Sequence, residues 1–339
     1  MDLQTIWFIL LGVLLGGYAA LDGFDFGVGI LHPLAKTDAE RRTFMNAIGP
    51  IWDGNEVWLI TFGGALFAAF PMAYATAFSG MYLALMLVLA ALIFRAVAIE
   101  FRSKRPGAGW RATWDWAFFG SSLVASLLFG VAAGNAVLGM PLDERGVFTG
   151  TFLGLLHPYA LLTGVLTVAL FAMHGSLYLG LKIQNEEFRE RIRGWSWHAW
   201  GVFLALYLLT TIYTLMQLPH ATKNFEQMPW AFAAVALNVF AVANIPRALF
   251  AKKPGQAFLS SVATIFALVF LLAVALWPNL IAASNDPNNS LTIYRAASSE
   301  KTLDIMLTIA MIGIPFVLGY TAAIYWTFRG AADVGEKSY

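Results

Sequence analysis

The chain has 339 residues, of which 59% are hydrophobic and only 12% are charged. Soluble domains carry about 25% charged residues, so this composition places the protein in a lipid bilayer. The net charge of +1 provides no basic excess for nucleic-acid binding. Because the chain has no cysteine, disulfide bonds, thiolate metal sites and a cysteine nucleophile are excluded.

Apolar segments long enough to cross a membrane recur along the whole chain, and a spanning helix needs about 20 such residues. Nine segments meet this length, and we predict one all-α transmembrane domain over residues 1–339. They are residues 4–30, 51–71, 76–100, 112–134, 154–181, 197–217, 229–249, 257–277 and 305–328. Pro71 leaves almost no loop between the second and third segments, which predicts a tight hairpin there.

Two local patterns add detail to the first part of the chain. Small residues four apart in the first segment, Gly12 with Gly16 and Gly23 with Gly27, favour close helix contact. The run Thr37-Asp38-Ala39-Glu40 is a capping box. It predicts a short helix over residues 38–49, lying on the membrane surface.

Basic residues are distributed unequally between the two sets of loops that nine spans create. One set, together with the C-terminus, holds sixteen of the 21 lysines and arginines, and the other set holds four. Cytoplasmic loops carry the excess of Lys and Arg in membrane proteins. The asymmetry therefore predicts an external N-terminus and a cytoplasmic C-terminus.

Seven charged residues lie within or at the edge of the first four predicted spans. A charge in the hydrocarbon core costs about 2.5–3.5 kcal/mol on insertion scales, so each needs a partner, a bound proton or water. All seven fall toward the predicted cytoplasmic side, which indicates a polar route into the membrane. They are Asp22, Asp25, Asp53, Glu56, Arg95, Glu100 and Asp115.

Two pairs of carboxylates have the spacing of neighbours on a helix face. Asp22 and Asp25 are three residues apart, and Asp53 and Glu56 repeat the arrangement on the next span. Carboxylates that repel each other in low dielectric favour retention of a proton by one of them, as a proton relay requires. Arg95 could neutralise one carboxylate. The alternative is a structural ion network with helix-capping acids, although the apolar and aromatic neighbours of Asp25 and Asp53 favour the relay.

Histidine provides no evident metal or haem site, and no catalytic residue is predicted. His157 and His174 are 17 residues apart in one predicted span, about 25 Å along a helix, so they cannot bind one ion. A lone buried histidine such as His174 is more often a hydrogen-bonded core residue than a ligand. The other three histidines are predicted at surfaces, and they are His32, His198 and His220.

These residues are compatible with two classes of function. One is an accessory subunit of a respiratory complex that supplies a proton path, and the other is a stand-alone proton-coupled membrane transporter. A transporter usually has polar or broken helices at mid-membrane. Here the charges lie toward one face, and Asn238 and Asn244 are the main interior polar side chains of the second half, which weighs against a transporter.

Several ordered motifs resemble those of subunit II of the cytochrome bd-type quinol oxidases. The resemblance is strongest over residues 18–135 and continues to residues 320–326. Its motifs are Leu-Asp-Gly-Phe-Asp-Phe-Gly-Val-Gly at 21–29, Glu-Arg-Arg at 40–42, Trp-Asp-Gly-Asn-Glu-Val-Trp-Leu at 52–59, Gly-Gly-Ala-Leu-Phe-Ala-Ala-Phe-Pro at 63–71 and Trp-Asp-Trp at 114–116.

The resemblance implies a bacterial inner-membrane oxidase that passes electrons from quinol to dioxygen without pumping protons. In that family haem b, haem d and the quinol-oxidising loop belong to subunit I, so the resemblance implies no cofactor in this chain. It implies a haem-bearing partner, a possible small single-helix subunit and surrounding lipid. It also implies two four-helix bundles, residues 1–135 and 154–277, with residues 305–328 as a peripheral helix.

The resemblance also implies a role for the buried charges. The family acids that match Asp25 and Asp53 are assigned to a cytoplasmic proton path. Arg95 and Glu100 match positions near that path, and Asp22 and Glu56 lie in the same two motifs. Glu100 stands where some relatives carry Asp, and Glu56 where some carry Gln.

Overall fold

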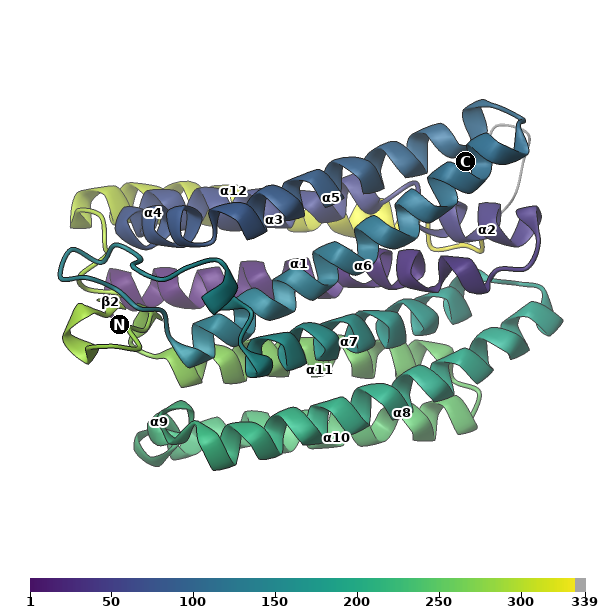
Figure 1. Cartoon of the computed structure of the whole chain (residues 1–339). Coiled ribbons are helices and arrows are strands. Elements are labelled where there is room, and N and C mark those ends of the chain that lie inside the picture. Colours follow the sequence, from purple (N-terminus) through teal and green to yellow (C-terminus); the bar gives the residue numbers. More distant parts are fainter. Residues whose placement is uncertain (333–339) are drawn as a thin grey trace.

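The computed structural model describes residues 1–332, and it is almost entirely helical (Figure 1). The long helices are α1 (Leu3–Leu31), α3 (Trp52–Ala69), α5 (Tyr82–Phe101), α6 (Ala108–Leu138), α7 (Pro158–Lys182), α8 (Glu186–Gln217), α10 (Phe232–Phe250), α11 (Pro254–Leu276) and α12 (Glu300–Thr327). The shorter ones are α2 (Asp38–Ile48), α4 (Pro71–Gly80) and α9 (Lys223–Gln227). Two short strands, β1 (Asn279–Ile281) and β2 (Leu291–Thr292), pair antiparallel.

Within residues 1–332, eight helices are long and apolar enough to cross a membrane, namely α1, α5–α8 and α10–α12. The second of the nine predicted spans forms α3, which is not among the eight. Asp53, Asn55 and Glu56 in its first two turns lower its mean hydropathy. Nevertheless α3 packs against α1 and lies alongside the membrane-length helices (Figure 1).

The predicted hairpin at Pro71 has a divided second arm. α3 ends at Ala69, and Pro71 opens α4 at a helix position where its missing N–H is not needed. The chain then bends at Met81, so the predicted span 76–100 is split between α4 and α5. α3 packs on α4 and α1, whereas α5 packs on α6.

α1 contacts helices from both halves of the chain, namely α3 and α6 of the first half and α7 and α11 of the second. A Cβ on Gly27 would lie 1.9 Å from the backbone oxygen of Phe171, and one on Gly175 would lie 2.5 Å from the carbonyl carbon of Gly27. Only glycine permits this backbone approach. Of the four predicted contact glycines, Gly12 alone has nothing within 4 Å.

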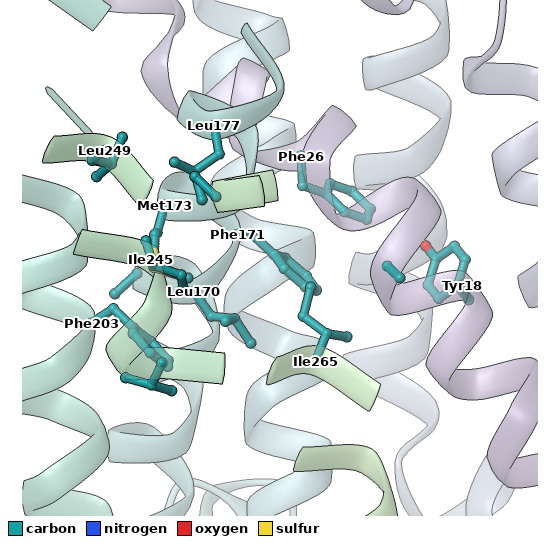
Figure 2. Packing of buried hydrophobic residues seen from close by; sticks show 14 of the residues in the cluster. Tyr18, Phe26, Leu170, Phe171, Met173, Leu177, Phe203, Ile245, Leu249 and Ile265 are labelled. Carbon is teal, nitrogen blue, oxygen red and sulfur yellow. The ribbon is translucent and has the colours of Figure 1, made fainter. Parts of the chain in front are cut away.

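Aromatic and aliphatic side chains fill the space beside this close contact (Figure 2). The rings of Phe26 in α1 and Phe171 in α7 stack with centroids 5.9 Å apart. Tyr18 packs edge-on against Phe26. This packing fixes the rotation of α1 about its axis, and so determines which way Asp22 and Asp25 point.

The loops are gathered at two ends of the helices (Figure 1). One end carries α2, the turns before α6, α8 and α11, and the end of α12. We call it the basic end, because it holds the loops predicted to be rich in Lys and Arg. Lys337, counted with them, lies outside the described residues. The N-terminus, α9 and β2 lie at the opposite end. The capping box is confirmed, since Thr37 Oγ1 accepts from the N–H of Glu40 at the start of α2.

Candidate functional site

Arg95 of α5 is held by a carboxylate of α1. Its Nη1 lies 2.7 Å from Oδ1 of Asp22, and its Nη2 donates to Oδ2 of Asp22 at 2.9 Å. Both side chains are 0% exposed. The guanidinium carbon also lies 4.0 Å from the ring centre of Phe26. The close ion pair, its one hydrogen bond and a cation–π contact compensate in part for the removal of both charges from water.

Glu56 connects this buried pair to the surface. Arg95 Nη2 donates to Glu56 Oε1 at 2.5 Å, and the Glu56 side chain is 22% exposed. One guanidinium thus faces two carboxylates, Asp22 from α1 and Glu56 from α3. These three side chains together carry one net negative charge when both acids are ionised.

Asp25, one turn along α1 from Asp22, is buried without a cation. Its Oδ2 accepts a hydrogen bond of 2.8 Å from Asn55 Nδ2. Its Oδ1 has no hydrogen-bond partner in residues 1–332. A buried, unpaired carboxylate oxygen is costly, and a proton or a bound water would satisfy it.

The Asn55 amide links three helices. Its Nδ2 donates to Asp25 and also to the carbonyl oxygen of Leu21 at 3.1 Å. Its Oδ1 accepts from the hydroxyl of Tyr325 in α12 at 2.8 Å. Neither residue was predicted from the sequence, although Asn55 lies between Asp53 and Glu56 in one motif and Tyr325 lies in the motif at 320–326.

Two predicted path residues do not join this cluster by direct contact. Asp53 was predicted among apolar neighbours, but it lies exposed in the first turn of α3. Asp53 lies about one helical turn before Glu56, and the first turn of α3 faces the basic end, so its side chain is at the surface. Glu100 is partly buried near the end of α5.

Asp115 belongs to a second cluster beside α2. Its carboxylate accepts from Arg102 Nε at 2.6 Å and from Arg41 Nη1 at 2.9 Å, and it lies 2.6 Å from His32 Nε2. Arg102 also donates to Asp38 at 2.8 Å. These bonds hold α2 against the ends of α1, α5 and α6. Asp115 is therefore part of a structural ion network, which was the alternative prediction for the charged residues.

His32 was predicted at the surface, and this prediction is wrong because its side chain is 1% exposed. The chain leaves α1 in a 3-10 turn, His32–Leu34, that lies against α6. Phe118 and Phe44 flank the ring. Hydropathy identifies the polar residue at a helix end but does not indicate that a turn folds it inward.

His174 is a hydrogen-bonded core residue, as predicted. Its Nδ1 lies 2.7 Å from Ser261 Oγ, and its Nε2 lies 2.9 Å from the Ala20 oxygen. The ring stacks on Phe258 with centroids 4.8 Å apart. Both ring nitrogens are engaged, so this side chain does not fit a haem-ligand position. In residues 1–332 no group of three or more His, Cys, Asp or Glu is arranged to hold a metal ion.

The chain is similar to known proteins over nearly its whole length. Residues 3–328 match the family model of cytochrome bd terminal oxidase subunit II. The chain is 39% identical to cytochrome bd-I ubiquinol oxidase subunit 2 of Escherichia coli K12, over 97% of this chain and 94% of that protein. It is 34% identical to cytochrome bd ubiquinol oxidase subunit 2 of Bacillus subtilis, over 97% and 96%.

A solved structure of bd oxidase from Geobacillus thermodenitrificans has the same fold, with a TM-score of 0.80. The match covers 97% of this chain and 99% of that chain at 16% identity. At this identity the likeness concerns the fold alone. Together with the family model and the two relatives, it confirms the resemblance found in the motifs. The chain therefore belongs to the family of cytochrome bd terminal oxidase subunit II.

Proposed function

We propose that this chain, as subunit II of a bacterial quinol oxidase that reduces oxygen, takes up protons at the basic end and delivers them toward a haem-bearing partner. The observation that carries this proposal is Asp25. It is a fully buried carboxyl group without a cation, held by Asn55 and left with one unpaired oxygen. Ionisable groups of this kind inside a membrane are typical of proton relays.

The proposed route follows the carboxyl groups inward from the surface. Asp53 receives a proton from water at the exposed start of α3. Glu56, one turn further along α3, accepts it where its side chain still reaches solvent. Asp22 and Asp25 hold it in turn on α1, with bound water joining groups that are not in contact. Arg95 joins Asp22 of α1 to Glu56 of α3. Glu100, partly buried near the end of α5, is the remaining acid of the predicted route.

We propose that the haems and the quinol site lie in the partner subunit. Haem b and haem d would supply the electron transfer and oxygen chemistry there. His174 supports this placement, since both of its ring nitrogens are used within the chain. Reduction of one dioxygen to water consumes four protons. If subunit II takes them from the cytoplasm, the reaction itself charges the membrane.

We also propose the membrane topology of the chain. It crosses the membrane nine times, with α3 as the second crossing, an external N-terminus and a cytoplasmic basic end. The two bundles are residues 1–135 and 154–277, with α12 peripheral.

The partner packs on the side where α3 and α12 lie, because Glu56 and Tyr325 are there. A small single-helix subunit and lipid cover other helix faces. Family membership disfavours a stand-alone transporter.

Replacing Asp25 by Asn in the complete two-subunit oxidase tests the relay. The amide keeps the size of the side chain but cannot exchange a proton, so we expect quinol-driven oxygen consumption per haem to fall about tenfold or more. The exposed Glu226 in α9, away from α3 and α12, provides a control, and Glu226→Gln should leave the rate unchanged. Normal turnover of the haem-replete Asp25→Asn oxidase would reject the relay. Loss of haem or of the partner would instead assign Asp25 a structural role.

A further inference from the structure

A second polar feature lies away from the acidic cluster. A cavity of about 310 Å³ opens at the basic end between α7, the start of α8 and the turn from α10 to α11. α8 and α10 form one edge of the molecule, whereas α3, α5 and α12 lie along the opposite edge (Figure 1). The cavity therefore takes no part in the proposed proton route.

The charges of the cavity are unbalanced. Arg189 pairs with Glu186 at 2.9 Å, and Arg193 pairs with Glu190. These two arginines are thereby neutralised within α8. Lys252 and Lys253 are both exposed, and within residues 1–332 neither ammonium group forms a hydrogen bond or an ion pair. The cavity thus presents two free positive charges to an incoming anion.

The backbone at Lys252 supports a role for its side chain. Its φ is 53°, in the left-handed region, and it is the one non-glycine residue of the described chain with a positive φ. Lys252 follows α10, where its N–H donates to the Leu249 oxygen and the N–H of Lys253 donates to the Ala248 oxygen. Glycine is the preferred residue at this position of a helix end. A lysine here adopts an unfavourable conformation and places an ammonium group at the cavity, and such outliers indicate function.

Besides its charged residues, the cavity is lined by Ser176, Ser196 and four large apolar side chains. The apolar ones are Leu177 and Leu181 of α7, Ile192 of α8 and Leu249 of α10. Leu181 is 38% exposed, whereas Leu177, Ile192 and Leu249 are almost fully buried, so Leu181 is the exposed member of the apolar set. A small free anion would leave Leu181 unused, whereas a molecule with an anionic head and an apolar tail would contact both the lysines and Leu181.

We propose that this cavity binds the headgroup of an anionic phospholipid from the leaflet at the basic end. The lysines contact the phosphate, and Leu181 contacts the first part of an acyl chain. Basic pockets between membrane helices on the cytoplasmic side are suited to acidic headgroups. The site does not depend on the proton route, so either proposal can fail alone.

Lipid titration of the purified two-subunit oxidase tests the site. Native mass spectrometry would count bound phosphatidylglycerol, with phosphatidylcholine and inorganic phosphate as comparison ligands. At about 1 kcal/mol per lysine, the Lys252→Gln/Lys253→Gln variant should bind phosphatidylglycerol about 30-fold more weakly. The matched control is Lys36→Gln/Lys104→Gln, which removes two exposed charges from the same end and should change affinity less than about threefold.

A third variant separates the ligand role of Lys252 from its structural role. Lys252→Gly suits the left-handed backbone, so it should raise the thermal stability of the delipidated complex while weakening phosphatidylglycerol binding. Equal weakening by both double variants would overturn the site in favour of a general surface potential. Binding of inorganic phosphate without lipid would show a free-phosphate site instead. Unchanged lipid affinity in the Lys252→Gly and Lys252→Gln/Lys253→Gln variants would also reject the proposal.

Discussion

The hydroxyl group of Tyr325 donates a 2.8 Å hydrogen bond to Oδ1 of Asn55, across 270 residues of sequence. The amide of Asn55 in turn donates to Asp25. The last helix of the described chain therefore orients the side chain that holds the buried carboxyl group. α12 otherwise has a largely exposed surface, so this bond gives it a specific part in the site.

Removal of the Tyr325 hydroxyl should slow the oxidase without removing its haems. Tyr325→Phe leaves Asn55 Oδ1 unpaired, at a cost of about 1–3 kcal/mol, and allows the amide to turn away from Asp25. We expect oxygen consumption per haem to fall about fivefold or more and its pH profile to shift. Tyr320→Phe, on the exposed surface of the same helix, is the control. If both variants match the parent in rate and pH profile, Tyr325 does not position Asn55.

Asp115 should matter for stability and not for turnover. Asp115→Asn weakens the bonds to Arg102, Arg41 and His32, leaving the fully buried Arg102 with less charge compensation. Breaking a buried pair costs about 3–5 kcal/mol, so we expect a lower melting temperature and earlier proteolysis near α2. Oxygen consumption per haem in the surviving complex should be unchanged. A slow but stable variant would move Asp115 into the proton route.

The glycine contact between α1 and α7 should tolerate no side chain. Gly27→Ala places a methyl group 1.9 Å from the Phe171 oxygen, so the two backbones must separate and the stacked aromatic core must repack. We expect poor assembly, measured as complex recovered per membrane protein. Gly12→Ala changes the same helix at a position with nothing within 4 Å and should assemble normally. Equal recovery of both would contradict the close approach.

Acid should weaken the attachment of α2 to α8. Arg191 donates to both carboxylate oxygens of Glu40, at 2.8 and 3.0 Å, and this lowers the pKa of Glu40. When a carboxyl group has a lower pKa in the folded protein than in the unfolded chain, its ionised form stabilises the fold at pH values above the unfolded-state pKa, about 4.3. This stabilisation is lost as the pH falls through the folded-state pKa. Glu40→Gln should therefore melt below the parent at pH 7.

The difference in melting temperature between the parent and Glu40→Gln should narrow steadily below about pH 4.3. Glu144→Gln, at the opposite end of the molecule and exposed, should give a difference that does not depend on pH in this way. A constant gap for Glu40→Gln across the acid range would show that its ion pair adds no pH-dependent stability.

The sequence by itself determined the membrane character, the approximate positions of most long helices and the family. These features depend on local composition, because a run of apolar residues satisfies its own backbone hydrogen bonds as a helix wherever it lies in a bilayer. The charged residues of the first four spans were also identified in this way. Their motifs in residues 21–29 and 52–59 carried the resemblance that the comparisons confirmed.

Only the tertiary structure decided how those charges are partnered. Arg95 binds Asp22 and Glu56, whereas Asp25 is held by Asn55 and, through it, by Tyr325. The physical reason is that a contact between helices depends on the rotation and depth of each helix. Those are set by long-range packing, such as the approach of α1 to α7, and hydropathy along one segment does not contain them.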